Sequence, residues 1–185
     1  MKEFGLELAE DKTGIVRFGR FARENARKKG RKPDEFTFLG FTHYCGKTKR
    51  GHFKVKRRTN SKKFRQSLSE FLDWAKRCRN VLRKGEMIRR AKVRIAGHLN
   101  YYAITDNSEM CKDYIHFATR ILFKWINRRS QRKSYTWDAF RQVLSWVKWP
   151  TPCVRVVLNP CRSTHCSPNG YSKSRMYGKT ACPVL

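Results

Sequence analysis

Two stretches in the first sixty residues have the apolar pattern of β-strands. Residues 36–45 (FTFLGFTHYC) form a mostly apolar run, which predicts one buried strand. After a loop over residues 46–51, Phe53 and Val55 fall on one side of an extended chain and the basic residues between them on the other. The two stretches therefore predict a hairpin with one basic face. A short basic helix is expected before it, within residues 15–30.

From residue 61 the apolar positions recur three and four apart in four successive stretches, which predicts four amphipathic helices. Ser61 is expected to cap the first helix and Thr136 the fourth, while Asn107 or Ser108 caps the third. Pro150, followed by Pro152, is expected to end the fourth. The expected core residues, helix by helix, are Phe64, Leu68, Phe71, Leu72, Ala75 and Cys78; Ile88, Ala91, Ile95, Leu99 and Tyr102; Met110, Tyr114, Phe117, Ile121 and Trp125; and Trp137, Phe140, Leu144 and Val147.

These patterns predict an α+β chain in three parts. Residues 1–58 are expected to contain the hairpin, and residues 59–152 the helical bundle. Residues 153–185 show no periodicity and are rich in Ser, Gly and Pro, so we expect a disordered tail.

Charge narrows the class of partner. The 185 residues carry 43 Lys and Arg against 14 Asp and Glu, a formal net charge of +29. Such a chain repels itself unless a polyanion neutralises it, which favours nucleic acid over the alternative of an anionic membrane surface. Basic residues outnumber acidic ones in every part of the chain, and 39% of residues are hydrophobic, which excludes a disordered basic tail. A folded domain with a cationic surface is expected.

Membrane insertion, secretion and a metal site are not predicted. Apolar runs are too short for a transmembrane helix, and the first ten residues lack a signal-peptide pattern. We expect a cytoplasmic protein, in the bacterial cytosol, with an organelle as the alternative. The seven cysteines are an odd number and are interpreted as reduced thiols. Cys161, His165, Cys166 and Cys182 fit no common zinc spacing, and no catalytic triad can be assembled.

Five short blocks occur in order along residues 3–150 and share one family pattern. They are Phe4–Leu8 with Lys12-Thr13, Phe36–His43, Gly97–Tyr102, Arg128–Gln131 and Thr136-Trp137. In this order they resemble group II intron reverse transcriptase-maturases, from the end of the palm through the thumb, or X, domain. The resemblance implies an end-of-palm remnant over residues 1–58 and a helical thumb or maturase domain over residues 59–152. The divergent tail leaves the family pattern.

The resemblance implies RNA binding that assists intron folding and splicing, and that grips template-primer duplex. The implied partners are group II intron RNA, RNA/DNA template-primer and a separately encoded finger-palm half. The chain has no Asp-Asp pair like the one that binds Mg²⁺ in the family, so it needs no cofactor alone, and Mg²⁺ belongs only to a complete polymerase. One alternative is half of a split RNA-directed DNA polymerase. Another is a non-functional relic of a mobile element.

Candidate functional residues come from the basic runs and from the family blocks. Basic side chains would contact phosphates, and Tyr101 would stack on an unpaired base while Tyr102 packs in the core. The competing interpretation of the basic runs is an ordinary solvated face, and Lys12 is interpreted as a solvated turn lysine. The candidate RNA-binding residues are Lys54, Lys56, Arg57, Arg58, Lys62, Lys63, Arg65, Asn100, Tyr101, Arg128, Arg129, Arg132 and Lys133, and the resemblance adds Phe38, Leu39 and Gly40 as the primer-holding element.

We predict that the purified chain alone incorporates no deoxynucleotides on a primed RNA template with Mg²⁺. Polymerisation needs carboxylates that hold Mg²⁺ at the reacting phosphate, and the chain lacks the Asp-Asp pair that supplies them in the family it resembles. A complete reverse transcriptase in the same assay is the positive control. Incorporation that persisted through stringent purification would contradict the prediction.

Overall fold

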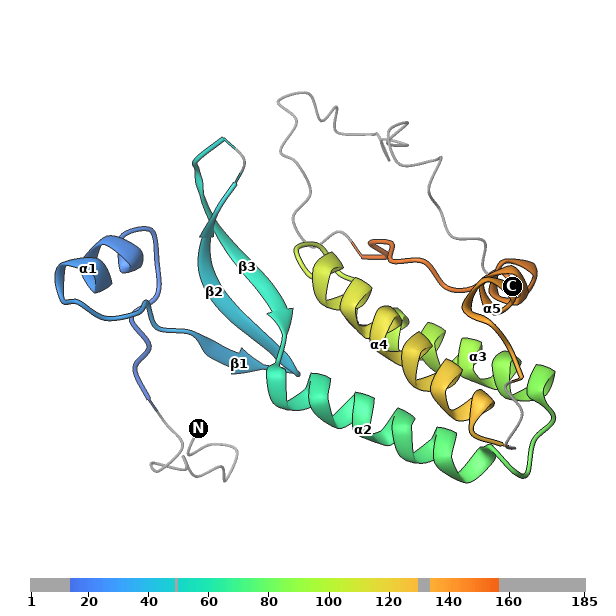
Figure 1. Ribbon diagram of the computed structural model, residues 1–185. Helices are drawn as coiled ribbons and strands as arrows, with labels where there is room; N and C mark the ends of the chain where they lie inside the picture. The colour runs from blue at the N-terminus through green and yellow to red at the C-terminus, as the bar shows by residue number, and fades with distance from the viewer. Residues whose placement is uncertain (1–13, 49, 130–133, 157–185) are drawn as a thin grey trace, which may run out of the picture. The chain divides into compact units, whose positions relative to one another are not determined.

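The protein folds into an α+β arrangement with two compact units. The structure, a computed structural model, describes residues 14–48, 50–129 and 134–156 (Figure 1). Its contacts divide the chain into an N-terminal unit, residues 1–57, and a helical unit, residues 58–185. The described residues form five helices and three strands. Among them, no helix combines the length and the apolar character needed to cross a membrane.

The three strands form one sheet in the order β1-β2-β3. The helix α1 (Ala22–Lys28) precedes β1 (Phe36–Phe38), β2 (Phe41–Lys47) and β3 (Phe53–Thr59). The expectation of a single strand over residues 36–45 was wrong. Phe38 pairs with Phe41 across a two-residue turn whose central residues, Leu39 and Gly40, have φ of 47° and 77°. A two-residue hairpin turn with positive φ at both positions reverses the chain at once, and the apolar run concealed it.

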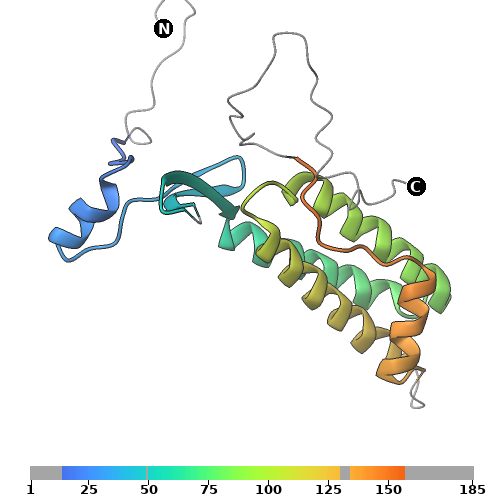
Figure 2. The same cartoon turned by 90° about the horizontal axis from the view of Figure 1, so that it is seen from above.

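The described part of the helical unit contains four helices, as the periodicity predicted. They are α2 (Ser61–Cys78), α3 (Lys84–Tyr102), α4 (Ser108–Asn127) and α5 (Trp137–Trp146). Helices α2, α3 and α4 lie side by side, and α5 lies against the end of this layer at which α4 ends (Figures 1 and 2).

Capping explains most of the helix boundaries. Thr136 caps α5 as predicted, because its Oγ1 accepts a hydrogen bond from Ala139 N at 3.3 Å. The cap of α2 is Asn60 rather than Ser61, since Asn60 Oδ1 accepts from Lys62 N at 2.9 Å. Asn, with a side-chain oxygen that reaches the second helical N–H, is as good a cap as Ser. After α5, Lys148 has a left-handed backbone conformation with φ of 52°, so the helix has ended before Pro150.

The apolar stripe of α3 forms the centre of the core, where the predicted residues Ile88, Ala91, Ile95 and Leu99 are buried. The predicted Tyr102 is only half-buried, and the buried Met87 was not predicted. Met87, Ile88, Ala91, Ile95 and Leu99 have no exposed surface. Burial of such side chains stabilises a domain by about 1.5–3 kcal/mol each for the larger ones. The helical unit therefore has its own apolar core, made of residues that all belong to it.

The buried face of α4 is rotated from the predicted one. Phe117 was expected in the core but is 44% exposed. The face is rotated because α4 packs against both α2 and α3, and the side facing them carries smaller residues, Ala118 among them. The buried residues of α4 are Cys111, Tyr114, Ile115, Ala118, Leu122 and Ile126.

A buried amide links the end of β3 to the loop before α4. Asn107 Oδ1 accepts a hydrogen bond from Thr59 N at 2.8 Å, and Asn107 Nδ2 donates to Thr59 Oγ1, also at 2.8 Å. Nδ2 donates as well to the carbonyl of Tyr102 at 2.8 Å. Asn107 precedes α4 as predicted, but its side chain makes no capping bond because these partners occupy it.

The chain after α5 returns to the connection between α3 and α4. Trp149 Nε1 donates to Thr119 Oγ1 at 3.0 Å, and Arg155 N donates to the carbonyl of Ala103 at 2.7 Å. Val156 bridges to Ile104 in parallel. Arg155 and Val156 of the expected tail are thus paired with the connection between α3 and α4, and residues 157–185 of that tail lie outside the described residues.

We predict that Asn107→Ala lowers the free energy of unfolding by about 2–4 kcal/mol. The substitution leaves the buried N–H of Thr59 without a partner and deletes two further hydrogen bonds. Urea denaturation measures the change. Asn100→Ala is the matched control, because Asn100 is exposed on α3 and its loss should change the free energy by no more than about 0.5 kcal/mol. Equal effects of the two substitutions would contradict the role given to Asn107.

Candidate nucleic-acid interface

The basic residues of β3 divide between the two sides of the strand. Lys54, Lys56 and Arg58 alternate with Val55 and Arg57, so they share one side. A Cβ placed on Gly46 would lie only 2.7 Å from Lys56 Cδ, which shows that the aliphatic stem of Lys56 crosses the bare backbone of β2. The hairpin therefore presents three of its four predicted cations on one side.

Arg57 belongs to the other side, beside His43. Burial lowers the pKa of His43, and the nearby positive charge of Arg57 lowers it further. Nη1 of Arg57 is buried and has no hydrogen-bond partner among the described residues. The strand period, rather than the density of basic residues in the sequence, decides which cations share a surface.

Three predicted cations crowd the first turns of α2. Lys62, Lys63 and Arg65 are exposed, and the first turn of this helix contains no acidic residue. The N-terminus of a helix carries a partial positive charge, so it repels cations placed beside it and attracts anions. This end of α2 is therefore an electropositive surface that a phosphate would stabilise.

The Gly97–Tyr102 block forms the last turns of α3. Asn100 is exposed and Tyr101 is 52% exposed. Tyr102 is half-buried and packs against His98, with ring centroids 4.5 Å apart. Tyr101 is thus the accessible tyrosine of the pair, and Tyr102 is the packed one.

Arg128 joins a cluster of cations around Trp125 at the other end of the layer. The cations lie over the indole ring, with Lys76 Nζ 5.9 Å, Arg79 Cζ 5.0 Å and Arg128 Cζ 5.6 Å from its centroid. Arg129 is half-buried, and the predicted residues Arg132 and Lys133 lie outside the described residues. We call Trp125 with these three cations the Trp125 cluster.

Two members of the Trp125 cluster were missed by sequence reasoning. Trp125 was interpreted as a core residue only, and Lys76 and Arg79 were not singled out. Lys76 and Arg79 are three residues apart, which places both on one side of the C-terminal end of α2. This spacing is the signal in the sequence that could have identified them. Lys76 also pairs with Asp73 at 3.5 Å, an exposed ion pair of little energetic weight.

The candidate residues of the helical unit thus gather at two ends of one helical layer. Phe64 of α2 packs against Tyr114 of α4, with ring centroids 6.2 Å apart, and His98 of α3 stacks on the same tyrosine at 3.5 Å. The beginning of α2, the end of α3 and the beginning of α4 therefore meet at one end, and the Trp125 cluster marks the other. Helix α4, which runs between the two ends, has 20 residues and therefore spans roughly 30 Å. Exposed cations of α4, Arg120 and Lys124, lie along the helix between the two ends.

The turn assigned to the primer-holding element is exposed. Phe38 and Leu39 both project at the tip between β1 and β2, with more than half of each side chain accessible. Gly40 supplies one of the two positive φ values that the turn requires. An apolar, accessible turn fits a contact with another molecule.

Possible metal and thiol chemistry is confined to isolated residues in the described part of the chain. No group of three or more His, Cys, Asp or Glu residues there is arranged to hold a metal ion. Cys45, Cys78, Cys111 and Cys153 form no disulfide among the described residues. Burial raises the pKa of the Cys111 thiol to about 11, which keeps it protonated and unreactive. The cysteines and the histidine weighed as a zinc site, like Lys12, lie outside the described residues.

We predict that the protein loses stability as the pH falls from 6.5 toward 4, through His98. Burial lowers the pKa of His98 from 6.5 to about 4, so between these values the unfolded chain binds a proton that the folded chain does not. The free energy of unfolding should fall by about 3 kcal/mol over this window. His98→Phe should remove most of this fall in urea titrations at several pH values.

His116→Gln is the control for the loss of a histidine, since His116 is exposed on α4 whereas His98 is largely buried. An identical pH dependence in the His98→Phe protein would show that His98 ionises normally in the fold.

Comparison with known proteins adds no relative: no family model, curated protein or solved structure matches the chain. The likeness to reverse transcriptase-maturases accordingly rests on the five sequence blocks.

Proposed function

We propose that this chain is the RNA-binding thumb, or maturase, portion of a group II intron-encoded reverse transcriptase. It binds intron RNA in the cytoplasm and stabilises the fold in which the intron splices, and it grips template-primer duplex when a finger-palm half is supplied. The observation that carries the proposal is the distribution of cations and accessible aromatic residues over both ends of one helical layer. The order of the family blocks supports the same assignment.

Electrostatics favours a polyanionic partner for this layer. The first turn of α2 places Lys62 and Lys63 at the positive end of the helix with no acidic residue to offset them. Their repulsion is relieved when a phosphate binds, and counterions released from the nucleic acid add to the free energy of binding. A protein surface that served only solubility would gain nothing from cations at this end of a helix.

The spacing of the two ends favours structured RNA over a small anion. They are separated by about the length of α4, roughly 30 Å, so a single small anion cannot reach both ends while a nucleic-acid duplex can. Double-stranded RNA is recognised mainly by its shape and its phosphates, and unpaired bases stack on exposed aromatic residues. Tyr101 at one end and Arg128 at the other are suited to these two kinds of contact.

We predict that the chain binds structured RNA with an affinity that falls steeply as the salt concentration rises. Replacing Lys62, Lys63 and Arg65 together with Ala should reduce the slope of log affinity against log salt by about 2–3, since each lost phosphate contact removes about 0.9. Filter binding over a range of salt concentrations measures the slope. The double replacement of Arg89 and Arg90, both paired with Glu86, is the control and should change the slope less for each charge removed.

The maturase assignment itself is tested by splicing. A group II intron transcript that splices poorly at low Mg²⁺ should splice faster with the protein present and not with the triple variant. Tight RNA binding without any effect on splicing, tried on introns of several structural classes, would leave RNA binding in place and overturn the maturase assignment.

A further inference from the structure

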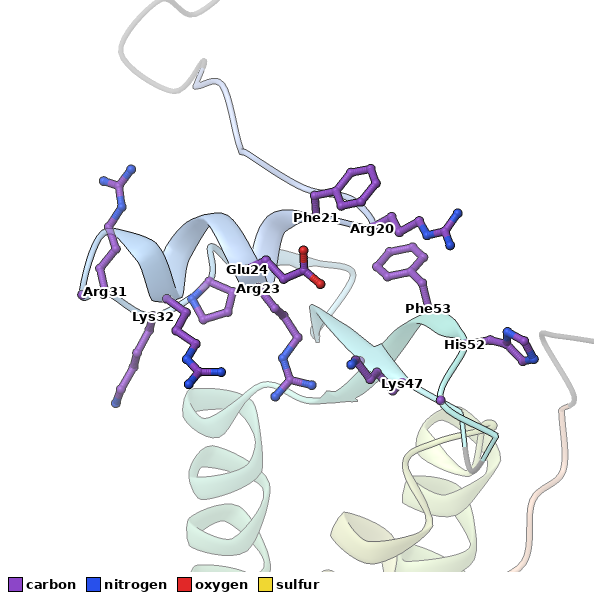
Figure 3. Close-up of a pocket in the computed structure, with 14 residues that line it drawn as sticks. Arg20, Phe21, Arg23, Glu24, Arg31, Lys32, Lys47, His52 and Phe53 are labelled. Carbon is purple, nitrogen blue, oxygen red and sulfur yellow. The ribbon is translucent and has the colours of Figure 1, made fainter.

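Helix α1 and the tip of the β2–β3 hairpin line a hollow of about 1130 Å³ within the N-terminal unit (Figure 3). We call it the α1 groove. One wall is the segment of residues 20–33, and the other consists of Gly46, Lys47 and residues 51–53. None of the residues predicted from the sequence to bind RNA lines this groove.

The helical wall is attached to the sheet by aromatic contacts. Phe18 packs edge-on against Phe36 of β1, with centroids 5.1 Å apart, and Phe36 stacks on His43 of β2 at 4.8 Å. Arg17 N donates to a carboxylate oxygen of Asp34 at 3.3 Å, which closes the loop around α1. These contacts hold the helix so that its basic side faces the groove.

The lining of the groove is strongly cationic. Six basic side chains and the single carboxylate of Glu24 line it, and none of the six forms an ion pair with any described residue. Like charges at this density repel one another, so an anion that entered would relieve the repulsion. The six are Arg20, Arg23, Arg27, Arg31, Lys32 and Lys47.

Two phenylalanine rings are accessible among these charges. Phe21 is 60% exposed and Phe53 is 37% exposed. Figure 3 shows the two rings near one another, one from each wall of the groove, with Arg20 beside them, and Arg20 Cζ lies 5.8 Å from the centroid of the Phe21 ring. Flat apolar surface bordered by cations is the combination that binds bases together with their phosphates.

We propose that the α1 groove binds a single-stranded segment of RNA, with phosphates on the cations and unpaired bases stacked on Phe21 and Phe53. The inference rests on the proposed function, because it takes the chain to be an RNA-binding protein, and it adds a second site with its own form of RNA. The volume exceeds the range of about 300–1,000 Å³ usual for small-molecule pockets, which suits several nucleotides of a polymer.

The aromatic rings distinguish a single strand from the other polyanions that the charge would attract. Bases within a duplex are stacked on one another and offer no free face to Phe21 or Phe53. An acidic peptide would satisfy the cations but carries no ring for the two phenylalanines. A single strand uses both features of the groove.

The test measures the affinity of the full-length protein for an oligocytidine of about 12 nucleotides, within the site sizes known for single-strand binders. Phe21→Ala combined with Phe53→Ala should weaken binding about tenfold or more, because stacking contributes about 1–3 kcal/mol per base. The same oligomer with abasic positions should bind the wild-type protein more weakly. This abasic oligomer should bind the double variant no more weakly than it binds the wild-type protein, because neither of these two complexes contains base stacking.

Arg23→Ala with Arg27→Ala should reduce the salt slope for the oligomer by about 1.4, at about 0.7 for each phosphate of a single strand. Trp146→Ala is the control for loss of an exposed aromatic residue, because Trp146 is 78% exposed on α5, in the other unit. Circular dichroism confirms that each variant is folded. The replaced phenylalanines are exposed, so little stability should be lost.

Three results would overturn the proposal. If the protein binds structured RNA but the phenylalanine variant binds the oligomer within twofold of wild type, the groove is not a stacking site and the proposed function stands. If polyglutamate of equal charge binds as tightly and depends equally on Phe21 and Phe53, the groove is a site for acidic peptides. If the protein binds no RNA of any form, the proposed function fails as well.

Discussion

The arrangement of the helical unit depends on one apolar face, that of α4. This helix packs against both α2 and α3, and Ala118 at its middle has no exposed surface. Ala91 on α3 is equally buried. Side chains this small allow helices to approach closely, and the surrounding Ile and Leu residues then fill the space between them. In a chain with a net charge of +29 this burial must offset the mutual repulsion of the surface cations.

Polar groups within the core fix how the helix ends meet. Asn107 ties the end of β3 to the connection before α4, and His98 stacks against Tyr114 with its pKa lowered by burial. Removing the partner of a buried hydrogen bond lowers the stability of the fold, and so does protonating a buried imidazole. The end of the layer that carries Tyr101 and the first turn of α2 is therefore held in register by specific contacts rather than by apolar packing alone.

Aromatic rings let this protein hold cations in place without neutralising them. Arg94 lies 4.9 Å from the centroid of Trp74, and Arg79 and Arg128 lie 5.0 Å and 5.6 Å from that of Trp125. A carboxylate partner would cancel the charge, whereas the face of a ring attracts a cation and leaves its charge available to a phosphate. The same logic applies to Arg20 and Phe21 in the α1 groove.

The sequence by itself determined the α+β class, the four long helices, the apolar stripe of α3 and the cationic surface. Each of these follows from local period and composition, which a chain carries whatever it packs against. Only the tertiary structure decided the turn at Leu39-Gly40, the side of α4 that is buried, the partner of Asn107 and the lining of the α1 groove. The period of a helix is compatible with two adjacent faces, and its neighbours select between them. The hydrogen bond from Thr59 to Asn107 joins two positions whose distance no local pattern encodes. The same is true of the two walls of the α1 groove, which come from separate parts of the chain.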